Sequence, residues 1–386
     1  MKSIVDFSTS NRVIFGVGSI SKLTALLENF GRNALFLQKR NLKASKIIHN
    51  YFSDNKIEYQ DIEVSGEPNV EKINQITQLA REYGCDFVVG LGGGSVLDTG
   101  KAVSALLSNP GDLLDYLEVV GGGQPLNTAA LPYIAIPTTS GTGSEVTKNA
   151  VISVPEKKVK VSMRHNYLLP EIALVDPELT YELPDNVTAF SGMDALTQVI
   201  EPYLSNGRNL MVDLFCRDAI QKAGQNLKRA YQNGSDVEAR MNMSWVSLMG
   251  GLSLANAKLG AVHGLAGPMG GMFDLPHGMI CAALLHSAME VNYQVIKSNE
   301  SDNPVLQRFT EIARWLTGRE EAGAEEGIYW IKKLTLDLKI PKLSEIGVTK
   351  DNFPEIIEKS KNSSSMKGNP TILSPENIAQ ILEKSY

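Results

Sequence analysis

The order of short apolar runs and helical stretches limits the fold of this chain more than any other feature. Up to about residue 185, helical patterns alternate with β-rich apolar runs, namely NALFLQ, CDFVVGLGGG, PYIAIPTT and EIALVDP. Such alternation is typical of a parallel sheet covered by helices. After the turn LPDN the β-rich runs stop, and helical patterns continue to the last residue. We therefore predict an α/β domain over residues 1–185 and an all-helical domain over residues 186–386, with a ligand in the cleft between them.

Composition and charge narrow the class of partner. The chain has 386 residues, of which 43% are hydrophobic, so it can bury a large core in two domains. Its net charge of −6 and the lack of long single-sign runs argue against nucleic acid and membrane partners and favour small molecules. Cys85, Cys216 and Cys281 lack CxxC spacing, which predicts free thiols packed as small apolar residues. No signal-peptide or membrane-span pattern occurs, so we expect a cytoplasmic protein, and we predict a homodimer.

A strand pattern runs into three glycines and then a helix in FVVGLGGGSVLDTGKAVSALL. Because Gly92, Gly93 and Gly94 carry no side chain, a ligand can approach the backbone closely, and the amides at the following helix N-terminus attract phosphate. These features outline a pyrophosphate site. The spacing is GxGxxS rather than GxGxxG, which taken alone is a weak dinucleotide fingerprint. The alternative is that Ser95 and Asp98 form an S-x-x-D variant of the capping box, which needs no ligand.

A second loop, IPTTSGTGSEVTKNA, follows the next strand pattern. Five hydroxyl residues and two glycines fall within residues 138–144, a high density for a simple connector. Their hydroxyls and amides are suited to a phosphate or a nicotinamide ribose, whereas the alternative is a Ser/Thr-rich turn capped by Ser144. Two such loops at successive strand ends favour a dinucleotide. The candidate cofactor residues of this loop are Thr138, Thr139, Ser140, Thr142 and Ser144.

Asp194 and Gln198 stand four residues apart in FSGMDALTQVIEPY, so on a helix they project from one face. A metal-binding pair at this spacing would combine a carboxylate with an imidazole, but here the second residue is an amide. The apolar stripe of the same helix consists of Met193, Leu196, Ile200 and Tyr203. The alternative is that Ser191 and Asp194 form a helix cap. In that case Asp194, Gln198 and Glu201 would be the solvated face of the helix.

Two histidines favour a site. His263 and His277 both lie in AVHGLAGPMGGMFDLPHGMICAALL, a segment that is apolar, rich in glycine and nearly uncharged. A lone histidine on an apolar face is more often a hydrogen-bonded core residue than a ligand. Two histidines in one such segment, with an unpaired carboxylate at Asp194, indicate a shared site instead.

The chain resembles the iron-containing alcohol dehydrogenase family in five segments, which occur in this order: GLGGGSVLDTGKAV, PTTSGTGSEVTKNAVIS, LLPEIALVDPELT, GMDALTQVIEP and HGLAGPMGGMFDLPHG. The resemblance extends from VIFGVGS near the start to NPTILSPENIAQIL near the end. It implies an N-terminal Rossmann-like domain and a helical C-terminal domain. It also implies NAD(P)-dependent interconversion of alcohols and carbonyls, with a divalent ion in the cleft.

The resemblance assigns roles to individual residues. The aspartate ligand of the family falls on Asp194, and its two later histidine ligands fall on His263 and His277. Its remaining histidine ligand falls on Gln198. A further histidine, which many members place four residues after the first late ligand, falls on Gly267.

Gln198 and Gly267, which replace two histidines of the family, change the expected ligands and proton route but not the expected reaction. One carboxylate and two histidines are the ligand set of a facial iron(II) site, and both Fe²⁺ and Zn²⁺ suit them. Gln198 would add its side-chain carbonyl oxygen as a weaker metal ligand, or orient a bound water. We expect the ion to polarise the substrate oxygen as a Lewis acid while nicotinamide C4 delivers or accepts hydride. Because Gly267 has no side chain, water or a ribose hydroxyl would carry the proton, with His165 as a less favoured relay.

Lys160 and Lys39 complete the candidate residues. Lys160, in KKVKVSMRH, resembles the family's lysine near the nicotinamide ribose, although a basic run is commonly a solvated face. Lys39, followed by Arg40, stands where many family members carry an aspartate that selects NAD. Two cations there suit a 2′-phosphate, so we expect NADP(H) to be preferred over NAD(H). The alternative is a solvated loop that tolerates both cofactors.

The leading prediction is an alcohol dehydrogenase or aldehyde reductase that acts on a small alcohol or aldehyde. One alternative is a lyase of the dehydroquinate synthase type, whose richer set of basic and histidine residues is not evident in this chain. Another is a non-catalytic nucleotide-binding protein with a decayed metal site, to which Gln198 and Gly267 point.

Overall fold

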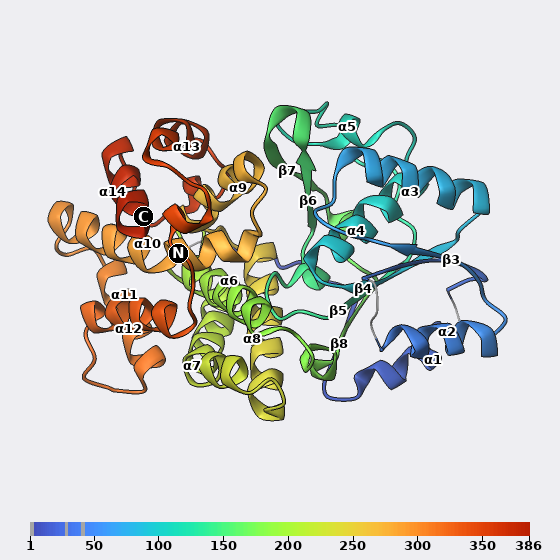
Figure 1. Ribbon diagram of the computed structural model, residues 1–386, viewed down its shortest axis with the longest axis horizontal. Helices are drawn as coiled ribbons and strands as arrows, with labels where there is room; N and C mark the ends of the chain where they lie inside the picture. Colours follow the sequence, from blue (N-terminus) through green and yellow to red (C-terminus); the bar gives the residue numbers. More distant parts are fainter. Residues whose placement is uncertain (1–3, 28–29, 40–42) are drawn as a thin grey trace. The chain divides into compact units, whose positions relative to one another are not determined.

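The structure is a computed structural model that describes residues 4–27, 30–39 and 43–386 (Figure 1). Its internal contacts divide the chain into two units. The α/β unit consists of residues 8–139 and 143–181, and the helical unit consists of residues 182–386 together with residues 4–7 and 140–142. In the described part of the chain, no helix has the length and apolar character needed to cross a membrane.

A parallel sheet forms the centre of the α/β unit. Among the described residues it has six strands in the order β1-β8-β5-β4-β2-β3, and every neighbouring pair is parallel. The strands are β1 Arg12–Phe15, β2 Asn33–Gln38, β3 Glu58–Glu63, β4 Phe87–Gly92, β5 Tyr133–Pro137 and β8 Ile172–Val175. A separate antiparallel hairpin joins β6 Asn149–Val154 to β7 Val159–Arg164. The predicted parallel sheet is thus confirmed.

The strands are short apolar runs because the sheet is covered on both faces. Every residue of β4 and β5 is buried, as expected for central strands of a parallel sheet. On one face lie α3 and α4, and on the other lie α1 and α2 (Figure 1). The helices of this unit are α1 Leu23–Leu27, α2 Ser45–Asp54, α3 Val70–Tyr83, α4 Gly94–Ser108 and α5 Leu113–Tyr116.

The order of the strands fixes where a ligand would bind in this unit. From β2 the chain continues to β3 on one side, whereas β4 lies on the other side of β2 and leads on to β5. Ligands of open α/β sheets bind at the carboxyl ends of the strands at such a reversal. Lys39 follows β2, and its backbone N–H donates to the Leu91 carbonyl near the end of β4, at 3.2 Å. Lys39 and the glycines that end β4 and begin α4 therefore lie at the reversal.

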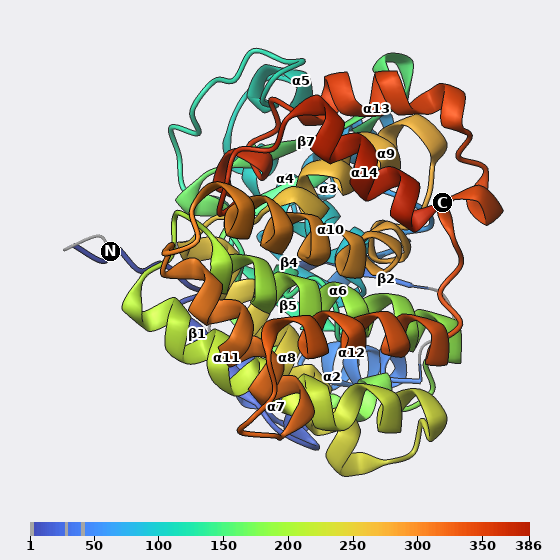
Figure 2. The ribbon, with the colours of Figure 1, turned by 90° about the vertical axis from the view of Figure 1, so that its left-hand side faces the viewer.

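The second unit is helical, as the sequence predicted, and Figure 2 presents it toward the viewer. Asn209 begins α7 by accepting the backbone N–H groups of Met211 and Val212, and Asp236 begins α8 by accepting that of Ala239. Helix α10 packs against α6, α9, α12 and α14. The helices are α6 Asp185–Leu204, α7 Leu210–Gln232, α8 Val237–Asn256, α9 Ala261–Phe273, α10 His277–Asn299, α11 Val305–Thr317, α12 Ala324–Asp337, α13 Phe353–Ser360 and α14 Pro375–Ser385.

Candidate functional site

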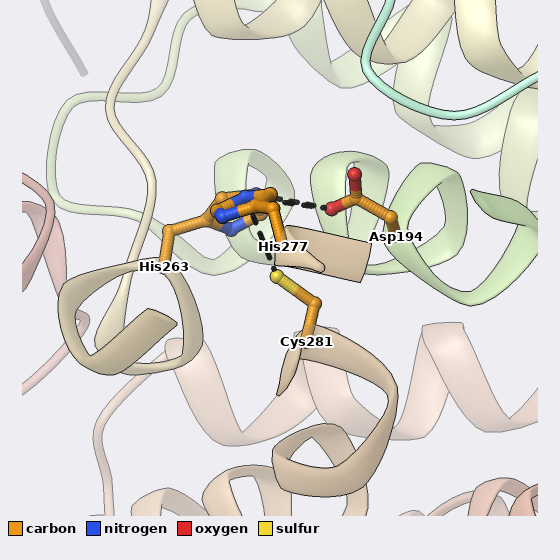
Figure 3. Close-up of side chains that lie close together, drawn as sticks. All are labelled: Asp194, His263, His277 and Cys281. Carbon is orange, nitrogen blue, oxygen red and sulfur yellow. Dashed lines mark hydrogen bonds and ion pairs between the residues drawn. The ribbon is translucent and has the colours of Figure 1, made fainter. Parts of the chain in front are cut away.

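Four side chains of the helical unit converge on one point (Figure 3). Asp194 comes from α6, His263 from α9, and His277 and Cys281 from α10. Each offers one ligand atom, and these atoms all lie within 4.8 Å of one another. We call these four residues the Asp194 cluster. Sequence reasoning brought three of them together and missed the fourth, Cys281.

The distances within the Asp194 cluster are short. Asp194 Oδ1 lies 3.5 Å from His263 Nε2 and 3.8 Å from His277 Nε2. Cys281 Sγ lies 3.5 Å from His277 Nε2. The side chain of His277 is 34% exposed, whereas that of Asp194 is 2% exposed. The cluster is therefore buried on the Asp194 side and accessible from the His277 side.

Local packing explains how α10 approaches α6. Gly278 follows His277 at the start of α10, and a side chain there would stand 2.7 Å from the Phe190 carbonyl oxygen and 3.4 Å from Asp194 Cβ. Because glycine has no Cβ, the two helices approach closely enough for His277 to face Asp194. His277 and Cys281 are four residues apart on α10, so they project from one face.

Glu201 orients His263. It lies on the same face of α6 as Asp194, two helical turns further along. Its Oε2 lies 2.7 Å from His263 Nδ1, and its Oε1 accepts the backbone N–H of Val262 at 2.7 Å. A hydrogen bond donated by Nδ1–H to Glu201 directs Nε2 of His263 toward Asp194. His263 Nε2 and Asp194 Oδ1 are both buried, and neither has a hydrogen-bond partner in the described part of the chain. A cation between these two atoms, which lie 3.5 Å apart, would compensate both, and it can be a proton or a metal ion.

The pKa values show how the Asp194 cluster behaves without a metal. Burial lowers the pKa of His263, but the neighbouring carboxylates of Asp194 and Glu201 outweigh burial and raise that pKa to about 9. Burial raises the pKa of Asp194, but His277 and His263 outweigh it and hold the pKa below its usual value. Burial, followed by the charge of Asp194, raises the pKa of the Cys281 thiol. A proton on His263 thus stands where the residues present fit a metal ion.

Gln198 has a partner of its own. Its Nε2 donates to the Thr142 carbonyl oxygen at 2.7 Å, and the same atom lies 3.3 Å from where a Cβ on Gly250 would stand. A carbonyl oxygen only accepts, so the amide nitrogen must face Thr142, and only Oε1 is left for an ion. The role of Gln198 as a ligand stays a prediction.

The solvated-face interpretation of this helix is wrong. Asp194, Gln198 and Glu201 are all buried. The Ser191 cap is also wrong, because α6 begins at Asp185 and the Ser191 hydroxyl donates back to the Val187 carbonyl at 2.7 Å. The apolar stripe of Met193, Leu196, Ile200 and Tyr203 is buried as expected.

The first glycine-rich loop lies against the start of the second loop, Thr138 and Thr139, within the α/β unit. The backbone N–H of Thr138 donates to the Gly92 carbonyl at 2.9 Å, and a Cβ on Gly93 would stand 3.3 Å from the Thr139 side chain. A Cβ on Gly92 would stand 2.4 Å from Val96, so this position needs glycine. Among the described residues no side chain caps the N-terminus of α4, which leaves its first amides for an anion.

The capping-box interpretation of Ser95 and Asp98 is wrong, because Gly93 is the N-cap and Asp98 lies one turn into α4. Asp98 instead accepts the Ser144 hydroxyl at 2.5 Å and the Val151 N–H at 2.9 Å, and it pairs with Lys101 at 2.9 Å. Ser144 therefore does not cap its turn, whose N-cap is Gly143. Contact of Asp98 and Ser144 with a cofactor stays a prediction.

The other residues that the sequence predicted for cofactor binding or proton transfer have different neighbours in the structure. Ser140 and Thr142 belong to the helical unit, where the Ser140 hydroxyl lies 3.0 Å from that of Ser244. The side chain of Lys160 is 3% exposed and pairs with Glu67 at 3.3 Å, so the solvated-face interpretation is wrong for this lysine. Lys39 is exposed, and its neighbour Arg40 lies outside the described residues. His165 Nδ1 accepts the Tyr167 N–H, as a turn cap.

Two features of the site were missed although the sequence contains a signal for each. Cys281 follows His277 by four residues, which places both on one helix face. Glu201 follows Asp194 by seven residues, two helical turns away on the same face.

Comparisons with known proteins agree along the whole chain. The family model "Iron-containing alcohol dehydrogenase" matches residues 10–177, and "Fe-containing alcohol dehydrogenase family, C-terminal" matches residues 188–386. Alcohol dehydrogenase 4 of Saccharomyces cerevisiae is 32% identical over 100% of both chains. The 1,3-propanediol dehydrogenase of Klebsiella pneumoniae is 34% identical over 99% of this chain and 98% of the relative. A solved 1,3-propanediol oxidoreductase has a TM-score of 0.91 at 30% identity, over 99% of this chain and 100% of that one.

Proposed function

This chain belongs to the iron-containing alcohol dehydrogenase family, and from that premise we propose that it interconverts a small alcohol and its carbonyl compound. Membership makes it an oxidoreductase that acts on CH–OH groups. In our proposal, hydride moves between the substrate carbon and C4 of NADP(H) or NAD(H), and a divalent cation, Fe²⁺ or Zn²⁺, is held by the helical unit.

One observation carries this proposal. His263 Nε2 and Asp194 Oδ1 face each other at 3.5 Å in a buried site, and neither atom has a hydrogen-bond partner among the described residues. A carboxylate and two imidazoles are a common donor set for divalent transition metals. Asp194, His263 and His277 would hold the ion, which supplies Lewis acidity toward a carbonyl oxygen. Glu201 keeps the lone pair of His263 directed at that ion.

The remaining roles fall to residues of the α/β unit and to residues 140–142 of the helical unit. The glycines 92–94 and the uncapped start of α4 would bind the pyrophosphate, with Ser95 at the first turn. Thr138, Thr139 and Ser140, with Thr142, would contact the nicotinamide end of the cofactor. Lys160, whose ammonium group is buried beside Glu67, would lie near the nicotinamide ribose.

The proton has no protein relay at residue 267. A Cβ placed on Gly267 would meet nothing within 4 Å, so that position has open space. Water in that space, or a ribose hydroxyl of the cofactor, would exchange the proton with the substrate oxygen. A cytoplasmic homodimer completes the proposal, and the three free, buried cysteines are consistent with a reducing compartment.

The test is a screen of small alcohols and aldehydes with both cofactors after reconstitution with Fe²⁺ or Zn²⁺. We expect net formation or consumption of reduced nicotinamide, measured by its near-ultraviolet absorbance. A dehydroquinate synthase-like lyase would convert substrate without net change in that absorbance. Tight cofactor binding without turnover under any metal would instead indicate a non-catalytic member, and either outcome would contradict the proposal.

A further inference from the structure

Cys281 completes a four-sided arrangement around the point where a metal would lie. For metal bonds of about 2.0–2.1 Å to nitrogen or oxygen and about 2.3 Å to sulfur, tetrahedral geometry separates the ligand atoms by roughly 3.3–3.6 Å. Asp194 Oδ1 and His263 Nε2 are 3.5 Å apart, and so are His277 Nε2 and Cys281 Sγ. With every pair within 4.8 Å, the four atoms need only a small contraction to enclose one ion.

Gln198 is poorly placed to fill this fourth position. Its amide nitrogen is held by the Thr142 carbonyl at 2.7 Å, and its side chain packs against Gly250 of α8. That hydrogen bond leaves only Oε1 for an ion, and an amide oxygen is a weak neutral ligand. The structure thus shows Gln198 holding residues 140–142 through a hydrogen bond, and a stronger fourth ligand would have to come from another residue.

We propose that Cys281 Sγ is the fourth metal ligand, so that this chain holds its ion through aspartate, two histidines and cysteine. The inference rests on the proposed metal site of Asp194, His263 and His277. On binding, a sulfur–metal bond replaces the S–H bond, and the proton leaves to solvent without any change of oxidation state. Three ligands with open positions are typical of iron(II), whereas a tetrahedral set that includes a thiolate is typical of zinc.

This ligand set predicts a preference for Zn²⁺ over Fe²⁺. A thiolate is a soft donor, and it favours zinc over the harder divalent ions. Zinc sites also expand from four to five donors during catalysis, so a fourth protein ligand does not close the site to substrate. The preference is measured by competing the two metals for the apoprotein under anaerobic conditions and analysing the bound metal.

Cobalt(II) tests the sulfur bond directly, because a thiolate bound to cobalt gives a charge-transfer band in the near ultraviolet. The full-length protein is loaded with Co²⁺ alone, and its metal content and spectrum are recorded in wild type, Cys281→Ser and Cys281→Ala. We expect the band in wild type and not in either variant, with zinc affinity at least about tenfold weaker in the variants. Cys216→Ser is the matched control, because Cys216 is also buried in the helical unit but contacts Ser253.

The outcomes separate this inference from the proposed function. Bound cobalt with no thiolate band in wild type would overturn the assignment of Cys281 and leave the three-ligand site intact. No stoichiometric binding of cobalt or zinc would overturn the metal site itself. Should both Cys281 variants misfold, X-ray absorption of the zinc-loaded wild type decides the question, because a bound thiolate gives a zinc–sulfur distance of about 2.3 Å.

Discussion

Each unit contains a cluster of polar and charged side chains, and the two clusters differ in whether their buried atoms are hydrogen-bonded. In the α/β unit, the Lys101 cluster consists of Lys101, Asp98, Ser144 and Thr147. The ammonium group of Lys101 is fully buried, and it contacts Asp98 at 2.9 Å, the Thr147 hydroxyl at 3.0 Å and the Ser144 carbonyl at 3.1 Å. In the Asp194 cluster, by contrast, a buried carboxylate oxygen and a buried imidazole nitrogen face each other without a hydrogen bond.

The difference separates a structural network from a binding site. A buried charge is tolerated when a counter-charge and hydrogen bonds compensate for its lost hydration, as they do around Lys101. In the Asp194 cluster the carboxylate and the imidazole lie 3.5 Å apart without a hydrogen bond, and a bound metal ion would supply the compensation. Burial and charge alone would have ranked the two clusters together, and only hydrogen-bond accounting tells them apart.

The largest expected effect is in the Asp194 cluster. His263→Ala should abolish stoichiometric metal binding and lower kcat/KM by about 10²–10⁴, because Lewis-acid stabilisation contributes several kcal/mol. Metal analysis after reconstitution and steady-state kinetics measure both effects. His286→Gln is the control, since His286 also lies on a helix of this unit but outside the cluster. Equal metal content in wild type and His263→Ala would contradict the assignment.

The second prediction breaks the Lys101 cluster. Lys101→Met should lower the free energy of unfolding by about 3–5 kcal/mol, because it leaves the Asp98 carboxylate without its counter-charge. Urea unfolding followed by circular dichroism measures this loss. Metal content of the folded variant should stay unchanged. The double variant Lys101→Met with Asp98→Asn should recover part of the stability, since it removes both charges. If the variant instead lost its bound metal and kept normal stability, the Lys101 cluster would support metal binding rather than the stability of the fold.

The third prediction concerns Glu145, a buried carboxyl group near Lys101. Burial raises its pKa from 4.5 to about 7, against the lowering effects of its own backbone N–H and of Lys101. Between those two pH values the native state binds more protons than the unfolded state, so the free energy of unfolding falls as pH rises. The total change is roughly 3 kcal/mol at 1.36 kcal/mol per pKa unit.

Glu145→Gln tests this assignment, because the amide cannot titrate. Urea unfolding at pH values from 4.5 to 7.5 should show a smaller pH-dependent loss in the variant than in wild type. Identical slopes in the two proteins would show that Glu145 keeps an ordinary pKa.

The sequence predicted the fold better than the surroundings of individual side chains. The apolar runs of β4 and β5 are buried on both faces, so their residue types encode the sheet directly. The polar face of α6 meets His263 of α9 and packs against α10, both of which come later in the chain, and helical periodicity does not reveal what a face will meet. For the same reason Asp98 matched a capping pattern while its partners, Ser144 and Val151, come from distant segments.

The smallest expected effect concerns Lys39, whose charge is exposed, unlike the buried charges of the two clusters. Lys39 is exposed at the carboxyl end of β2, where water weakens its interactions, so a 2′-phosphate bound there gains only about 1–2 kcal/mol. We therefore predict that wild type prefers NADPH, and that Lys39→Asp shifts the ratio of kcat/KM for NADPH and NADH by about tenfold toward NADH. Lys43→Asp is the control, because it makes the same charge change in the segment that follows β2. A wild-type preference for NADH would contradict the role of Lys39. An equal shift in both variants would mean that general charge, rather than a contact with the 2′-phosphate, sets the preference.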